Sequence, residues 1–140
     1  MSDSIFSKII RGEIPSHKIY EDDFVIAILD IGPISEGHAL VIPKEPAETI
    51  AKLSDEFSAA CGRVLPRVTR AIMKVTGASA VNILQNNGRE AGQAVDHVHF
   101  HIIPRFTDRN EGAGLSADWN PGTLSQEDAL ELGKQIKRLL

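Results

Sequence analysis

Residues 97–101 read HVHFH, so three of the chain's five histidines alternate with the apolar residues Val98 and Phe100. Successive side chains of a β-strand point to opposite faces, and residues two apart share a face. β-branched and aromatic residues favour strands, and the run continues with Ile102 and Ile103. The pattern therefore predicts a strand with three imidazoles on one face and buried apolar side chains on the other.

Apolar patterns along the rest of the chain predict a mixed fold. Apolar runs bounded by turn residues predict further strands over residues 18–22, 24–31, 38–44 and 79–86, with the histidine strand over 98–104. Helical spacing predicts a main helix that begins after Ser54, ends at Gly77 and is kinked at Pro66. Short helices are predicted over residues 5–15 and 125–140. This order indicates an α+β domain with a mostly antiparallel sheet.

Length, charge and composition exclude several classes of protein. A chain of 140 residues suits one domain. Its net charge of -4 argues against a broad nucleic-acid-binding surface. The single cysteine, Cys61, excludes an intramolecular disulfide framework. The N-terminus resembles no signal peptide, and no apolar run is long enough to span a membrane. We therefore expect a soluble cytoplasmic protein that binds neither nucleic acid nor membranes.

The histidine row permits three interpretations. It could be a polar sheet face, as single histidines usually indicate. It could bind a metal, since His-X-His is a common ligand pair. The first and last positions, His97 and His101, are about 13 Å apart in a strand, whereas a zinc–nitrogen bond measures about 2 Å. Two adjacent histidines, such as His97 and His99, could therefore share one ion, but a straight strand hardly lets all three do so.

The third interpretation is nucleophilic catalysis at phosphorus or a similar centre. An imidazole that is neutral near pH 7 is a good nucleophile when its second nitrogen is held by an acceptor. The middle histidine, His99, has a neighbour about 6.6 Å away on each side, close enough for all three to touch one phosphate. Geometry therefore favours His99 as the nucleophile and its neighbours for positioning and proton supply.

The same residues carry a resemblance to a known family. HVHFHII resembles the motif of the histidine triad (HIT) family, in which three histidines alternate with apolar residues. The stretch NNGREAGQAVDHVHFHIIPR is similar to the family's signature block, and the order of IFSKIIRGEIPSHKIYEDD and AILDIGPISEGHALVIPK resembles the Hint branch. The resemblance covers roughly residues 4–105.

The resemblance implies a fold and an assembly. We expect one HIT domain over residues 1–140, with a core over 1–105 and a C-terminal arm and helix over 106–140. The implied fold is a five-stranded antiparallel sheet with one main helix, and the implied assembly is a homodimer whose sheets join into one. The arm, Phe106–Thr123, carries Trp119 and could cross to the partner's site, as such segments do in relatives.

The resemblance also implies the chemistry. A purine nucleoside phosphoramidate or a dinucleoside polyphosphate would be attacked by His99, and water would release the mononucleotide from a covalent nucleotidyl-histidine. The carbonyl near His97 would orient His99, and His101 would bond the phosphate or the bridging atom. His38 matches the family's outlying fourth histidine and would join the triad network.

The remaining site residues follow from the same resemblance. Asp30 would take the ribose hydroxyls, and Asn86 and Gln93 would hold the phosphoryl group and the ribose side of the loop. An apolar purine slot would be formed by Ile5, Phe6, Ile9, Ile14 and Ile31, which ordinary core packing explains equally well when each is taken singly.

Several positions depart from the family's pattern. Zinc-bearing members carry Cys-X-X-Cys where this chain has Ser4 and Ser7, and Pro46 replaces a further histidine ligand. We therefore expect no structural zinc, and the mechanism requires no cofactor. Ala94 stands where many members have a hydroxyl beside the phosphate. Arg105 resembles the branch that cleaves dinucleoside polyphosphates and could meet anionic phosphates, although a solvated strand-end arginine is equally consistent.

The sequence thus predicts a HIT-family enzyme that hydrolyses purine nucleotide conjugates through His99. Two alternatives from other classes stay open. One is a nucleotide-binding regulatory protein in which turnover is incidental. The other is a metal-binding protein that uses His97 and His99 as its ligands.

Overall fold

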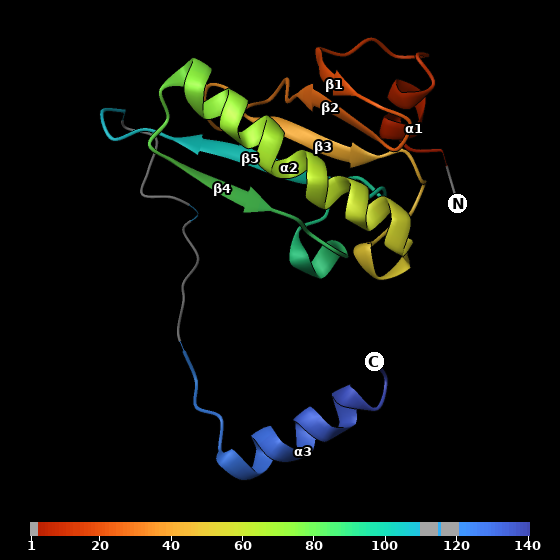
Figure 1. Cartoon of the computed structure of the whole chain (residues 1–140), viewed down its shortest axis with the longest axis vertical. Coiled ribbons are helices and arrows are strands. Elements are labelled where there is room, and N and C mark those ends of the chain that lie inside the picture. Colours follow the sequence, from red (N-terminus) through yellow and green to blue (C-terminus); the bar gives the residue numbers. More distant parts are fainter. Residues whose placement is uncertain (1–2, 110–114, 116–120) are drawn as a thin grey trace.

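A computed structural model describes residues 3–109, 115 and 121–140 (Figure 1). One five-stranded sheet has the strand order β1-β2-β3-β5-β4. The strands are β1 Lys18–Glu21, β2 Val25–Leu29, β3 Ala39–Pro43, β4 Ala80–Leu84 and β5 Phe100–Arg105. The helices are α1 Ile5–Ile10, α2 Asp55–Thr76 and α3 Gln126–Lys137, with short 3-10 turns η1 Ile50–Lys52 and η2 Arg89–Ala91.

All strand pairs of the sheet are antiparallel, as the sequence predicts. Strand β2 pairs with β3 along its whole length, from Val25↔Pro43 to Leu29↔Ala39. Strand β5 lies between β3 and β4, so the histidine-bearing segment, although late in the sequence, enters the middle of the sheet. Strands β1 and β4 form the two edges.

Helix α2 covers one face of the sheet (Figure 1). The Ser54 hydroxyl accepts from the backbone N–H of Phe57, and Gly77 ends the helix in the left-handed conformation at φ 77°. The helix continues through Pro66 as a single element. Its buried residues pack on Val25, Ala27, Ala39, Val41 and Ile102 of the sheet, and are Ala60, Cys61, Val64, Val68 and Ile72.

Helix α1 lies over the opposite face of the sheet. Its buried residues, Phe6 and Ile9, pack on a floor of four strand residues, Ile26, Ile28, Leu40 and Ile42. The Ser4 hydroxyl caps this helix by accepting from the N–H of Ser7. The two apolar faces of strands β2 and β3 therefore carry separate packing clusters, one under each helix.

Gly37 allows the turn before β3 to approach the end of α2. Its φ is +87°, and an added Cβ would lie 2.9 Å from Cγ2 of Thr76 and 3.1 Å from Cγ2 of Ile72. Both the backbone conformation and the space therefore require glycine here. The next residue is His38, so this close contact also fixes the backbone position from which the His38 side chain extends.

The predicted straight strand of three histidines is wrong. Strand β5 begins at Phe100, so His97 and His99 precede it and only His101 lies within it. The ladder between β3 and β5 ends at Val41↔Phe100, and two residues further along β3 is Pro43, which has no N–H to donate. His97 instead lies in a bend, and its backbone N–H donates to the carbonyl of Val95.

The C-terminal helix forms as predicted, with the Ser125 hydroxyl accepting from the N–H of Asp128 at 3.1 Å. Helix α3 buries no side chain in the described chain and stands apart from the sheet (Figure 1). Most of the predicted arm, including Trp119, lies outside the described residues. Among the described residues, no helix is both long and apolar enough to cross a membrane.

Candidate active site

A cavity of about 540 Å³ lies between α1, the end of β2 and the segment that leads into β5. The apolar residues predicted to form a purine slot all line it: Ile5, Phe6, Ile9, Ile14 and Ile31. Four of the predicted polar site residues also line it: Asp30, Asn86, His99 and His101. The structure thus gathers in one cavity residues that lie almost one hundred positions apart in the sequence.

His99 presents one nitrogen to this cavity. Its Nδ1–H donates to the carbonyl of His97 at 2.7 Å, which fixes the tautomer and leaves Nε2 as an unprotonated acceptor. The edge of the ring meets Phe6, with centroids 4.9 Å apart. Burial lowers the pKa of His99, against the opposing effect of the His97 carbonyl. The imidazole is therefore neutral and nucleophilic near pH 7.

His97 lies behind the cavity rather than in its wall. The side chain is fully buried, its Nε2–H donates to the carbonyl of Pro43 at 2.8 Å, and burial lowers its pKa. Its Nδ1 therefore accepts, from the hydroxyls of Ser4 at 3.3 Å and Ser7 at 3.5 Å. The expectation that all three histidines touch one phosphate is wrong, because the bend before β5 turns this ring away.

Sequence reasoning noted Ser4 and Ser7 only as missing zinc ligands and did not assign them to His97. The two serines lie 93 and 90 positions from His97, so spacing along the chain gave no signal for this contact. The carbonyl of Pro43 could not be found from residue types, since every residue carries one.

A second hydrogen-bonded pair joins β3 to β5. The N–H of Ile34 donates to His38 Nδ1 at 3.0 Å, so the proton of His38 is on Nε2. That nitrogen lies 2.9 Å from His101 Nδ1 and 3.5 Å from a carboxylate oxygen of Asp30. If His38 donates to His101, the remaining nitrogen of His101, Nε2, carries a proton and can act as a donor in the cavity.

The electrostatics of this pair favour neutral rings. Burial lowers the pKa of His38, and the Asp30 carboxylate opposes that shift. Burial and the neighbouring imidazoles lower the pKa of His101 to about 4. Both rings are therefore uncharged at neutral pH, and His101 acts as a hydrogen-bond donor rather than as a standing positive charge.

The pair is better suited to move a proton than to hold a metal. Ligand atoms of Asp30, His38 and His101 lie within 4.8 Å of one another, as the ligands of an ion would. However, His38 Nδ1 accepts an N–H from Ile34, so a metal on Nε2 would require the imidazole to lose its only proton. The alternative pair, His97 and His99, is also poorly arranged, because Nε2 of His97 is engaged by Pro43.

Gln93 lies under the loop instead of in the cavity wall. It is buried, its Oε1 accepts from the N–H of Gly88 at 2.7 Å, and its Nε2 donates to the carbonyls of Glu48 and Val95. The amide therefore has its partners within the protein and holds the loop that carries Ala94 and Val95 beside the cavity.

Two further positions noted in the sequence have defined surroundings. Asp30 is partly exposed at the cavity, and one of its oxygens accepts from the N–H of Gly32 at 2.8 Å. Arg105 donates to the side-chain oxygen of Asn82 at 2.9 Å, so in this structure it supports the β4–β5 pair.

Comparisons with known proteins show relatives of this chain in sequence and in fold. A sequence model described as HIT domain matches residues 11–108. The adenosine 5'-monophosphoramidase hnt1 of Schizosaccharomyces pombe is 48% identical and aligns over 94% of each chain. The adenylylsulfatase HINT3 of Arabidopsis thaliana is 47% identical over 74% of this chain and 53% of its own. A crystal structure of a HIT family protein from Bacillus anthracis superposes with a TM-score of 0.91 at 35% identity, over 99% of this chain and 98% of that one.

Proposed function

Because the chain belongs to the HIT family and is a nucleotidyl hydrolase of that family, we propose that it cleaves purine nucleotide conjugates through a covalent nucleotidyl-histidine on His99. The conjugates are nucleoside phosphoramidates or dinucleoside polyphosphates, and the product is the mononucleotide. The observation that carries this proposal is the 2.7 Å hydrogen bond from His99 Nδ1 to the His97 carbonyl, because it leaves the opposite nitrogen ready to attack.

In the first step the Nε2 lone pair of His99 attacks phosphorus, and the bond from phosphorus to the leaving group breaks with its electrons. His101 donates its Nε2 proton to the bridging atom, so the amine or phosphate departs in protonated form, and His101 recovers a proton from the attacking water in the second step. In the second step water attacks the nucleotidyl-histidine. The mononucleotide leaves, and His99 regains its free nitrogen.

The cavity wall suits the nucleoside part of such a substrate. Ile5, Ile9 and Ile14 offer apolar surface against which a purine can stack. The Asp30 carboxylate at the cavity can accept from the ribose hydroxyls, and the Asn86 amide also lines the cavity. Gln93 would act indirectly, by fixing the loop around the phosphoryl group.

The choice of leaving group rests on two relatives. One is named for cleaving adenosine 5'-monophosphoramidate and the other for acting on an adenylyl sulfate. Both names indicate a nucleoside 5'-phosphoryl group with a variable leaving group, and we propose the phosphoramidate as the preferred class. Ala94 removes one hydroxyl donor beside the phosphate, which we expect to slow turnover relative to a relative with serine there.

The proposed assembly is a homodimer joined at the β4 edge. Strand β4 ends the sheet and its edge is unpaired within the described chain, with Ile83 48% exposed. An unpaired edge accepts another strand readily. A second copy of the chain at this edge would extend the sheet around a two-fold axis.

The test is a short pulse of adenosine 5'-phosphoramidate and, separately, diadenosine tetraphosphate, with and without EDTA. The intact mass of the quenched protein is measured by mass spectrometry to detect an AMP adduct. We expect an adduct that forms with EDTA and disappears in His99→Ala. His17→Ala is the matched control, since His17 is exposed and lies outside the cavity. Mononucleotide binding without adduct or product would favour the regulatory alternative, and loss of activity with EDTA would favour a metal.

A further inference from the structure

Helix α3 has an apolar side that no other described residue buries. Positions 129, 132, 133 and 136 recur at helical spacing and hold Ala129, Leu132, Gly133 and Ile136. The opposite side is charged. Leu132 and Ile136 are each about half exposed, at 50% and 51%. A helix with this pattern is stable chiefly when its apolar side is covered, because short helices gain little from their own hydrogen bonds in water.

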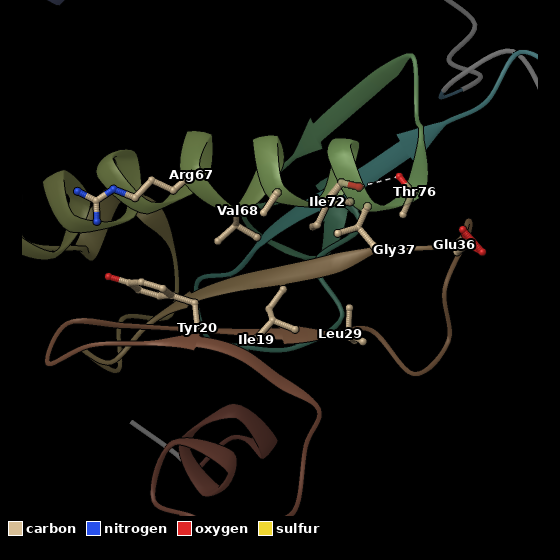
Figure 2. Close-up of a pocket in the computed structure, with 11 residues that line it drawn as sticks. Ile19, Tyr20, Leu29, Glu36, Gly37, Arg67, Val68, Ile72 and Thr76 are labelled. Atoms are coloured by element: carbon tan, nitrogen blue, oxygen red, sulfur yellow. Dashed lines mark hydrogen bonds between the residues drawn. The ribbon is translucent and has the colours of Figure 1, made fainter.

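A groove of about 710 Å³ lies between α2 and the β1 edge of the sheet (Figure 2). Ile19 and Leu29 form its strand side, and Val68, Ile72 and Val75 form its α2 side. Val75 is 86% exposed, which is unusual for a valine on a helix that otherwise buries its apolar stripe. The groove lies on the face of the sheet opposite the histidine cavity, so the proposed chemistry does not use it.

The groove and the helix match in length and in the sign of their end charges. The α2 wall runs from Arg67 to Thr76, which is about 14 Å at 1.5 Å per helical residue. The apolar side of α3 from Ala129 to Ile136 spans about 10 Å on the same scale. Arg67 lies at one end of the groove and Glu36 at the other (Figure 2).

The two ends of α3 carry the complementary charges. Its first turn contains Glu127 and Asp128, and its last turn contains Lys134 and Lys137. An acidic N-terminal turn beside Arg67 and a basic C-terminal turn beside Glu36 would place unlike charges together at both ends. One orientation of the helix in the groove is therefore favoured over its reverse.

We propose that α3 of one copy docks in the α2–β1 groove of a second copy, and that the second copy returns the same contact. The groove of its own copy stands open while α3 lies clear of it, on the side of the β4 edge (Figure 1). A dimer joined at β4 extends the sheet on that side, and the partner's groove then lies toward the far, β1 edge of the partner's sheet, on the same side of the molecule as α3. The inference therefore rests on the proposed dimer but not on the proposed hydrolysis.

The length of the connecting chain sets how far α3 can reach from its own core. Residues 110–124 are 15 in number and span at most about 50 Å when extended. The arm begins near Arg109, whose guanidinium lies 3.7 Å from Glu36. A mutual exchange of two such helices would add two apolar contacts to one strand pairing, and both would be lost together on dissociation.

Cysteine pairs test which copy α3 occupies. Val75→Cys is placed in one tagged copy and Ile136→Cys in another, the two are co-expressed, and a short bismaleimide is added. We expect a covalent heterodimer on a denaturing gel. Glu131→Cys on the charged side of α3 is the matched control and should give little product. The native Cys61 is buried and burial raises its pKa to about 12, so it contributes little reaction.

A double variant, Val75→Cys with Ile136→Cys in one chain, separates the two arrangements. Mutual docking yields covalent dimers. Cross-linked monomers alone would show that α3 folds back onto its own groove and would overturn the proposal. Absence of any product above the Glu131→Cys level would overturn it as well, because the groove would then be free or taken by another partner.

The contribution of the contact is measured by charge insertion. Leu132→Asp/Ile136→Asp should weaken dimerisation in sedimentation equilibrium by at least about tenfold, since two half-buried apolar side chains are lost from each contact. Gln135→Asp adds one negative charge on the polar side and should leave the association constant within about twofold. Equal association constants for the double variant and this control would contradict the docking. AMP adduct formation, followed in parallel, reports on the hydrolysis independently.

Discussion

The two faces of the sheet use the same strands for opposite purposes. On the α2 face, Ala27 and Val41 pack against an apolar helix stripe without any polar group. On the α1 face, their neighbours Ile28 and Leu40 form the floor of a cavity whose walls include His99 and His101. The stability of the first face depends on how well its side chains fill the available volume. The chemistry of the second face depends on which imidazole nitrogens carry protons. Because successive side chains of a strand point to opposite faces, one strand contributes to the packed core on one side and to the cavity on the other.

The difference has a thermodynamic side. A buried apolar residue stabilises the fold at any pH, whereas a buried neutral imidazole does so only while the unfolded chain is also neutral. His38, His97, His99 and His101 all have lowered pKa values because of burial. The histidine face should therefore weaken in acid while the α2 face does not. The following predictions separate the two faces, from the largest expected effect to the smallest.

His99→Ala should have the largest effect and should act mainly on chemistry. We expect kcat/KM for adenosine 5'-phosphoramidate to fall by about 10⁴-fold or more, because the nucleophile is removed. Urea unfolding, measured in parallel, reports the separate loss of stability, since His99 is buried against Phe6 and donates to the His97 carbonyl. Residual turnover above a few per cent would contradict its role as nucleophile.

Acidification should destabilise the protein as pH falls from about 6.5 to about 4. The folded pKa of His101 is lowered to about 4, and the other three buried imidazoles also shift downward. Over this range the unfolded chain binds more protons than the folded one, so the free energy of unfolding falls with pH. We expect the summed loss to exceed that of one truncated core valine.

Urea titrations between pH 7.5 and 4.5 measure this loss. His101→Gln should flatten the curve below pH 6.5, because it removes the group with the largest shift. His17→Ala, at an exposed histidine outside the cavity, is the matched control. A flat titration in the parent protein would show that the rings are not held neutral by burial.

Val64→Ala tests the other face. Val64 is fully buried in the α2 stripe, and truncation should lower the free energy of unfolding by about 2 kcal/mol. Turnover per folded molecule should be unchanged, because the substitution is on the far side of the sheet from the cavity. Differential scanning calorimetry and kcat at saturating substrate provide the two readouts, and a fall in kcat above about twofold would show that the faces are coupled.

Ser4→Ala/Ser7→Ala should have the smallest effect. The two hydroxyls do not contact the substrate in the proposed mechanism, but they donate to Nδ1 of His97. Their loss leaves Nδ1 of His97 without a donor, so the ring is held less firmly and so is the backbone carbonyl of His97 that orients His99. We expect kcat to fall about threefold to tenfold with little change in KM. Ser4→Thr with Ser7→Thr, which keeps both hydroxyls, should restore most of the rate.

The sequence predicted the elements whose signals are local. The stripe of α2 with its Ser54 cap and the strands of the sheet follow from side-chain periodicity, which a sequence displays directly. The apolar residues around the cavity were expected only from the resemblance to the HIT family.

The parts that were wrong or missing depend on backbone groups of distant residues. The start of β5 at Phe100 reflects the missing N–H of Pro43 on a neighbouring strand. The binding of Gln93 to the loop depends on the carbonyl of Glu48, 45 positions away. Carbonyls carry no signature in the sequence, so periodicity could not reveal that His97 would turn behind the cavity.

The main-chain carbonyls of His97 and Pro43 hold the two rings of the proposed site in one tautomer. No point mutation deletes a carbonyl, so this orientation is shielded from most genetic change. Side chains that line the cavity, such as Ala94 and Ile31, do not contribute to the orientation of these rings. Libraries randomised at those positions can therefore explore new leaving groups and bases without disturbing the nucleophile, which makes the scaffold a practical starting point for directed evolution.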